Sequence, residues 1–198
     1  MQDMESTTSV HHGMEPPRQG HWYAIRTRSN FEKRIAGELG EKGLEPYLPA
    51  YEETRQWKDR KQKIAVPLFA GYLFARFLAS PEERLRVLKT AGVVRILGHD
   101  GRIEPIPEEQ IEAVRTVLNS RVVCFAQPLL REGVRVRVVR GALEGLEGAM
   151  VRRKKQARLV ISIPLLNQSV VAEVNTRDVE VIGKRPRRFV GAEPCIQT

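Results

Sequence analysis

The sequence predicts an α+β chain of two domains, in which an antiparallel-leaning sheet with three helices is followed by an all-β SH3-like small barrel. Two observations predict this class. Up to about residue 119, helix and strand patterns succeed one another without the regular strand–helix repeat that a parallel sheet requires. Beyond residue 130 the pattern is strand only, in short runs separated by polar or glycine-containing turns. With 198 residues the chain is long enough for two small cores.

The first two elements are a strand and a helix. Residues 21–29, HWYAIRTRS, are rich in aromatic and β-branched side chains, which favour a strand. Ser29 and Glu32 have the spacing of a capping box and predict a helix start. The helix is expected over residues 31–42, and one apolar stripe runs along it: Phe31, Ile35 and Leu39.

A hairpin is predicted in the middle of this first domain. Residues 44–57 contain two prolines, which cannot donate to a strand ladder, and are therefore expected at a sheet edge. The charged residues 54–63 are expected at the hairpin tip. Residues 64–77 give the strongest strand pattern of the chain, with a bend at residues 67–71.

Two further helices complete this domain. Ser80 is the expected N-cap of the second, because proline follows it at the first helical position and a glutamate stands three residues on. Residues 93–97 are a predicted strand. The third helix opens at Pro107 and carries an apolar stripe: Ile111, Val114 and Leu118.

The second half of the chain predicts a barrel. Valines at 134, 136 and 138 alternate with arginines, which is the period of a half-buried strand, and five such strands fit into about 50 residues. The predicted organisation is a disordered leader over 1–20, a first domain over 21–119, an apolar linker over 120–130, a barrel over 131–182 and a disordered basic tail over 183–198.

Composition limits the classes of partner and compartment. The net charge of +9 favours an anionic partner such as nucleic acid. No apolar run approaches the roughly 20 residues that cross a bilayer, so we expect a soluble cytoplasmic protein. Cys124 and Cys195 lack the spacing of a metal site or a disulfide framework, and Cys124 is expected to be a buried free thiol.

No catalytic motif is present in the sequence. The chain lacks a phosphate-binding loop, a GxSxG nucleophile elbow and an HExxH zinc motif. Outside the leader the histidines are His21 and His99, and neither has a partner at useful spacing. We therefore expect a protein that is not an enzyme, with no catalytic residues, no metal and no cofactor.

Three strings in this order carry a family resemblance: WYAIRTRSNFEKRIA (Trp22–Ala36), PLFAGYLFARF (Pro67–Phe77) and EGVRVRVVRGALEGLEGAMV (Glu132–Val151). Together they resemble the NusG family of transcription elongation factors over Trp22–Ile182. The resemblance implies an NGN-type domain at residues 21–119 that binds RNA polymerase, and a KOW domain at residues 131–182.

The resemblance also implies where polymerase binds. Family members dock on the clamp helices of the largest polymerase subunit through an apolar patch, which by position contains Trp22, Phe69, Tyr72 and Phe74. Aromatic side chains suit a docking surface because they bury a large area at a low entropy cost. The alternative is that these rings belong to the core, and on a regular strand Phe69, Tyr72 and Phe74 cannot all point one way.

Two further contacts follow from the same resemblance. Arg28, Lys33 and Arg34 match the region that touches the non-template DNA strand, although a solvated helix face explains them equally well. In the KOW domain, Leu143 and Leu146 are the expected partner-binding residues, for a ribosomal protein or the termination factor Rho. Leu146 replaces the usual phenylalanine, which leaves affinity for those partners open.

The string RQWKDRKQKIAVPLF (Arg55–Phe69) is closest to the specialised UpxY- and RfaH-like paralogues, which favours a monomeric antitermination factor for particular long operons. One alternative is the housekeeping NusG factor, which couples polymerase to Rho or the ribosome. Another is a KOW-containing ribosomal or RNA-binding protein that grips RNA with the basic residues Arg152–Arg158. Refolding of the second domain into helices is disfavoured by its β-branched runs.

Overall fold

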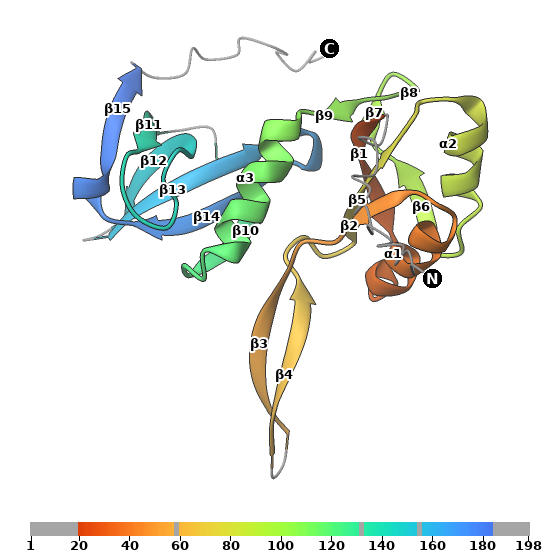
Figure 1. Ribbon diagram of the computed structural model, residues 1–198, viewed down its shortest axis with the longest axis horizontal. Helices are drawn as coiled ribbons and strands as arrows, with labels where there is room; N and C mark the ends of the chain where they lie inside the picture. The colour runs from red at the N-terminus through yellow and green to blue at the C-terminus, as the bar shows by residue number, and fades with distance from the viewer. Residues whose placement is uncertain (1–19, 58–59, 131–132, 154–155, 184–198) are drawn as a thin grey trace, which may run out of the picture.

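The computed structural model describes residues 20–57, 60–130, 133–153 and 156–183. Figure 1 shows one sheet with two helices, a second sheet that curls on itself, a helix between the two and a projecting hairpin. All strand pairs of the described residues are antiparallel, and the α-helices among them are α1, α2 and α3. Two short 3-10 helices lie at Pro164–Leu166 and Thr176–Asp178. The predicted α+β class is therefore confirmed; the predicted leader and tail lie almost wholly outside the described residues.

The N-terminal sheet has the strand order β2-β5-β1-β6, with β9 also paired to β1. The edge position predicted for the proline-containing segment is confirmed, since β2 pairs only with β5 in this sheet. The strands are β1 (His21–Thr27), β2 (Glu45–Tyr47), β5 (Tyr72–Phe77), β6 (Val93–Ile96) and β9 (Pro105–Ile106).

Helices α1 (Glu32–Glu41) and α2 (Pro81–Leu88) cover one face of this sheet. The predicted cap of α2 is confirmed, because the Ser80 hydroxyl accepts a hydrogen bond from the Glu83 backbone N–H. The predicted capping box of α1 is wrong. Its N-cap is Phe31, with no side-chain cap, and the carboxylate of Glu32 instead accepts a hydrogen bond from the Gly71 N–H at 2.8 Å.

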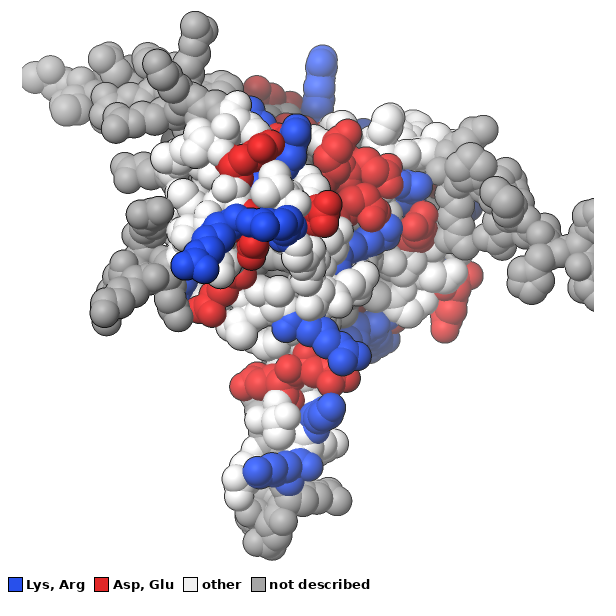
Figure 2. All heavy atoms as spheres, turned by 60° about the vertical axis from the view of Figure 1, so that its left-hand side comes forward, with Lys and Arg blue, Asp and Glu red and all other residues white. Residues whose placement is uncertain are grey.

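The predicted hairpin is confirmed and forms its own two-stranded sheet, β3 (Ala50–Trp57) with β4 (Arg60–Pro67). The single edge strand expected over 44–57 is wrong, because the chain breaks between β2 and β3 next to Pro49. In Figure 2 the hairpin projects from the body with both acidic and basic residues on it. Lys63 and Glu52, for example, form an exposed ion pair at 3.4 Å.

Short elements escaped prediction. Strands β7 (Gly98–His99) and β8 (Arg102–Ile103) form a small hairpin, and β9 returns to pair with β1. Two-residue strands leave no periodic pattern in a sequence, since alternation needs several residues to show.

Helix α3 (Glu108–Asn119) lies between the two sheets in Figure 1. It contacts both β1 and β13 (Gln156–Ile163) of the second sheet. Four of its side chains are buried: Ile111, Ala113, Val114 and Val117. The apolar contacts around α3 form one continuous cluster, which includes Trp22 and Phe74 of the first sheet and Ile161 and Ile163 of the second.

The second sheet has six strands in the order β10-β14-β13-β12-β11-β15, which confirms an all-β C-terminal half. The five predicted strands are present, but the segment expected to be a linker contains a sixth, β10 (Cys124–Pro128), paired with β14. Cys124 is a half-buried free thiol. The remaining strands are β11 (Val134–Val138), β12 (Glu147–Arg153), β14 (Gln168–Val174) and β15 (Val179–Gly183).

Candidate protein-binding site on the N-terminal sheet

An aromatic cluster occupies the face of the N-terminal sheet that lies toward α3. Strand pairing sets Ala24 of β1 opposite Phe74 of β5, and Trp22 stands two residues before Ala24 on the same face. Tyr47 of β2 stacks on Phe74 with ring centroids 6.1 Å apart and meets Trp22 edge-on at 6.2 Å. Phe69 completes the cluster, with its ring perpendicular to that of Phe74 at 6.0 Å. We call these four rings the aromatic patch.

Two arginines lie over the aromatic patch. Arg76 of β5 and Arg115 of α3 place their guanidinium carbons 5.0 and 5.1 Å from the Trp22 ring centroid, and Arg115 is 4.7 Å from that of Tyr47. These distances permit cation–π attraction. Glu108, in the first turn of α3, accepts a hydrogen bond from the Trp22 indole N–H at 3.3 Å and also pairs with Arg76. The aromatic patch therefore anchors α3 at two points.

Burial raises the pKa of Tyr47 to about 12, although the nearby Arg115 opposes this by favouring the phenolate. Glu112 acts in the same direction as burial. The phenol is therefore neutral at physiological pH and keeps its proton as a hydrogen-bond donor.

The turn that carries Phe69 and Tyr72 is fixed from two sides. Gly71 has φ of +78°, a conformation that favours glycine, and it bridges the break between β4 and β5. Its carbonyl accepts a hydrogen bond from the Thr27 N–H at 2.9 Å, and its N–H donates to the Glu32 carboxylate. Glu32 is only 4% exposed, so this carboxylate is held inside the fold.

Because of this turn, Phe69, Tyr72 and Phe74 do not diverge as expected for a regular strand. They would diverge on a regular strand, but the chain turns between Leu68 and Gly71, so Phe69 is not in strand register with Tyr72. Phe69 and Phe74 belong to the cluster that joins the two halves, and Tyr72 packs against it while half-buried. The backbone turn thus brings all three to one side.

Trp22, Phe69 and Phe74 are almost fully buried, at 1%, 0% and 0% exposure. A partner can therefore reach these three rings of the aromatic patch only when the elements that cover them move, whereas Tyr47 is half-buried. Docking of RNA polymerase through Trp22, Phe69, Tyr72 and Phe74 stays a prediction.

The residues expected to touch DNA are all on the surface. Arg28, Lys33 and Arg34 are exposed, and Arg34 forms an ion pair with Glu38 along the helix at 2.8 Å. The backbone N–H of Arg28 donates to the Gly92 carbonyl. Nothing in these contacts separates a DNA contact from a solvated helix face, so the assignment stays a prediction.

The residues expected to bind a partner in the C-terminal half differ in exposure. Leu143 is 3% exposed and belongs to the core, whereas Leu146 is half-buried. Backbone hydrogen bonds fix this loop, because the Leu146 carbonyl accepts from Val138 and the Gly145 N–H donates to the Val138 carbonyl. Leu146 therefore offers more surface to a partner than Leu143.

Five residues of the site were not predicted from the sequence: Glu32, Tyr47, Arg76, Glu108 and Arg115. Tyr47 and Arg115 carry no local signal, since their contact joins β2 to a helix more than 60 positions away. Glu32 has the spacing of a capping box, but its carboxylate accepts a hydrogen bond from the Gly71 N–H and does not cap α1. Within the described ranges no group of His, Cys, Asp and Glu could hold a metal ion, and no described helix is long and apolar enough to cross a membrane.

Comparison with known proteins shows what the chain is similar to. Residues 20–115 match the family described as transcription termination factor nusG. This match extends from β1 into α3, so the N-terminal half is similar to that family.

The solved structure of Thermotoga maritima NusG is similar over 83% of this chain and 98% of its own, at 16% identity and a TM-score of 0.51, and thus shares the fold. Two conformations of the MjSpt4:Spt5 complex match at 18% and 17% identity, with TM-scores of 0.29 and 0.27. Each covers 83% of this chain and 99% of its own. None of the curated proteins compared matches the chain.

Proposed function

We propose that this protein is a transcription elongation and antitermination factor, which binds the clamp helices of RNA polymerase through the aromatic patch and Tyr72. The observation that supports this best is the composition of the patch. Four rings lie in mutual contact on one sheet face, and large aromatic side chains dominate protein-binding hot spots. Binding acts by differential affinity for the elongating state of polymerase, without covalent chemistry.

Docking requires an open state in which α3, the C-terminal half or both move away from the aromatic patch. The described arrangement is closed, because the apolar cluster runs without a break from the patch through α3 into the barrel. The structure of T. maritima NusG, which has the same fold, is described as one of domain interaction. Closing the patch in the free protein protects a large apolar surface from water until a partner is met.

Within this function we favour a specialised paralogue that acts on particular long operons, because of the sequence of the hairpin and the following turn, Arg55–Phe69. The C-terminal half would then recruit a second partner, with Leu146 the more available contact. A ribosomal protein or Rho is the partner that the housekeeping branch would use.

The test of docking is co-purification of the full chain with core RNA polymerase. Tyr72→Ala removes a half-buried ring at the rim of the aromatic patch, and loss of a hot-spot ring costs about 2 kcal/mol, or roughly thirtyfold in affinity. Tyr51→Ala is the matched control, since Tyr51 is a 36% exposed ring on the hairpin. Equal affinity for wild type and Tyr72→Ala, with both folded by circular dichroism, would contradict docking at this patch.

Opening has its own measurement. Amide hydrogen exchange should show less protection of α3 or β13 in the polymerase-bound protein than in the free protein, because these elements join the two halves in the closed state. Unchanged protection in both elements would mean that the patch stays covered and that polymerase binds elsewhere.

A further inference from the structure

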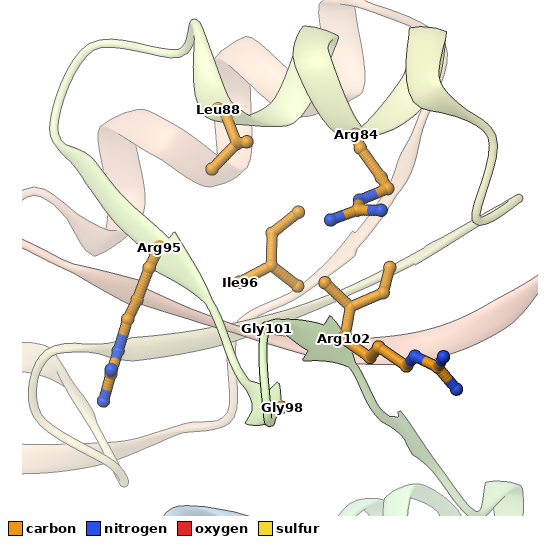
Figure 3. Close-up of a pocket in the computed structure, with 8 residues that line it drawn as sticks. Arg84, Leu88, Arg95, Ile96, Gly98, Gly101 and Arg102 are labelled. Carbon is orange, nitrogen blue, oxygen red and sulfur yellow. The ribbon is translucent and has the colours of Figure 1, made fainter.

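A row of three side chains crosses the N-terminal sheet at the end near Gly71. Arg26 of β1 stands opposite Tyr72 of β5 on one side and opposite Arg95 of β6 on the other. Ile25 and Ile96, their neighbours, pack into the core under α1 and α2. Because side chains alternate along a strand, Arg26 and Arg95 point to the other face. Figure 3 agrees, since Arg95 there points away from Arg84 and Leu88 of α2.

The two positive charges of this row have no acidic partner in the part of the chain that the structure describes. Arg26 and Arg95 are exposed and form no ion pair with the residues that the structure describes. Adjacent strands lie about 4.8 Å apart, and like charges directly opposite one another destabilise a sheet. Placing the two positive charges opposite one another adds no stability by itself, so a ligand is the more economical explanation for their pairing.

The other end of the same sheet face offers an internal comparison. There, Arg76 pairs with Glu45 and Glu108, and Arg115 pairs with Glu45 and with Glu112. Arg76 and Arg115, which link β5 and α3 to their neighbours, thus each form ion pairs with carboxylates. The row at Arg26 lacks them among the described residues, which distinguishes it from the structural arginines of the same face.

An aromatic ring stands beside the two charges. The Arg26 guanidinium carbon lies 6.0 Å from the centroid of the Tyr72 ring, which is half-buried. A sheet surface that combines arginines with an aromatic ring suits single-stranded nucleic acid, because the guanidinium groups pair with phosphates while the ring stacks on a base. An acidic protein segment would need the two charges but would gain little from the ring.

We propose that Arg26, Tyr72 and Arg95 form a binding site for single-stranded nucleic acid on the open end of this sheet. The site is made of different residues from Arg28, Lys33 and Arg34 at the start of α1. It goes beyond the proposed function and does not rest on docking to polymerase. Tyr72 also borders the aromatic patch, so it belongs both to this site and to the proposed polymerase-binding surface.

The test is fluorescence anisotropy of the full chain with labelled twelve-residue oligothymidylate and oligouridylate, over a range of salt concentrations and without polymerase. Arg26→Gln/Arg95→Gln should weaken binding roughly tenfold or more at low salt. The slope of log affinity against log salt should fall by about 1.4, at about 0.7 for each lost phosphate contact on a single strand. The matched control is Arg102→Gln/Lys89→Gln, which removes the same charge from exposed positions of the same domain.

The ring has a separate readout. Tyr72→Leu should lower affinity roughly tenfold with little change in the salt slope, because stacking carries no charge, whereas Tyr72→Phe should bind like wild type. Circular dichroism melting curves check that each variant is folded.

Three results would overturn the proposal. The first is equal weakening by the site pair and the control pair, which would show that only overall charge matters. The second is full binding by the site pair together with its loss in Arg28→Gln/Lys33→Gln/Arg34→Gln, which would place the contact at the helix start. The third is a glutamate-rich peptide that binds as tightly as the oligonucleotides, insensitive to Tyr72→Leu, which would indicate an acidic protein partner. Loss of polymerase co-purification in Tyr72→Ala bears on docking alone and leaves these results unaffected.

Discussion

The carboxylate of Glu32 should prove to be a main support of the turn that presents Phe69 and Tyr72. It is buried at 4% exposure, and it accepts the N–H of Gly71 at 2.8 Å. Glu32→Ala removes that acceptor while the Gly71 carbonyl keeps its bond from Thr27. The turn would then be held from one side only, with a partly buried N–H left without its partner.

The magnitude follows from the kind of bond. A hydrogen bond to a charged group contributes about 1.5–3 kcal/mol, and an orphaned N–H costs about 1–3 kcal/mol. Glu32→Ala also removes a buried carboxylate, and the cost of keeping that group away from water disappears with it. This offsets part of the loss, so we expect a net decrease of about 2 kcal/mol in the free energy of unfolding. Urea unfolding measures it directly. Because one apolar cluster joins the two halves, they are expected to unfold together as a unit of more than 150 residues, in which each kcal/mol lowers the midpoint of thermal unfolding by roughly 2–4 °C.

Two variants make the result specific. Glu32→Gln keeps an oxygen acceptor and should lose clearly less stability than Glu32→Ala. Glu38→Ala, on the same helix, removes only an ion pair with the exposed Arg34 and should cost at most about 0.5 kcal/mol. The reasoning fails if Glu32→Ala is as stable as Glu38→Ala, or if the glutamine variant is as damaged as the alanine variant.

Three other predictions concern single groups. Ser80→Ala removes the N-cap of α2 and should lower the free energy of unfolding by about 1 kcal/mol in urea titration. Because the pKa of Tyr47 is about 12 in the folded state and 10.0 is its ordinary value, the unfolded chain loses this proton first. Stability should therefore fall as the pH rises from about 10 to about 12, which alkaline unfolding followed by absorbance at 295 nm would check. Ser169→Ala removes the hydroxyl that accepts the Leu130 N–H and contacts the Ser162 hydroxyl, and calorimetry should show a loss of about 1–2 kcal/mol.

Much of the fold could be predicted from the sequence because its signals are local. Ser80 caps α2 through an atom three residues away, and the valines around Val136 alternate within one strand. The turn before Tyr72 was also visible as a proline and a glycine inside an apolar run. These features depend on neighbours in the chain, which is the information that a single sequence holds.

The features that failed depend on distant partners. Glu32 has capping-box spacing, but a better donor at Gly71 reaches it across 39 positions and the cap is not formed. Strand β10 lies in the segment predicted to be a linker, because its five residues show no alternation and only their pairing with β14 defines the strand. The closed state is not predicted from the sequence either. The apolar residues of α3 could all pack on one sheet or could contact two different sheets, and the sequence does not distinguish these arrangements.

Because the apolar cluster around α3 joins the two halves without a break, the stability of each half depends on its contact with the other. A change in the barrel that weakens its contact with α3 should raise the population in which the aromatic patch is free, although it lies far from any ring of the patch. The coupling works equally in the other direction, because a ligand that favours the open state on one half must favour it on the other by the same factor. Any molecule that captures the free C-terminal half would thus act as a positive effector of the N-terminal sheet without touching it.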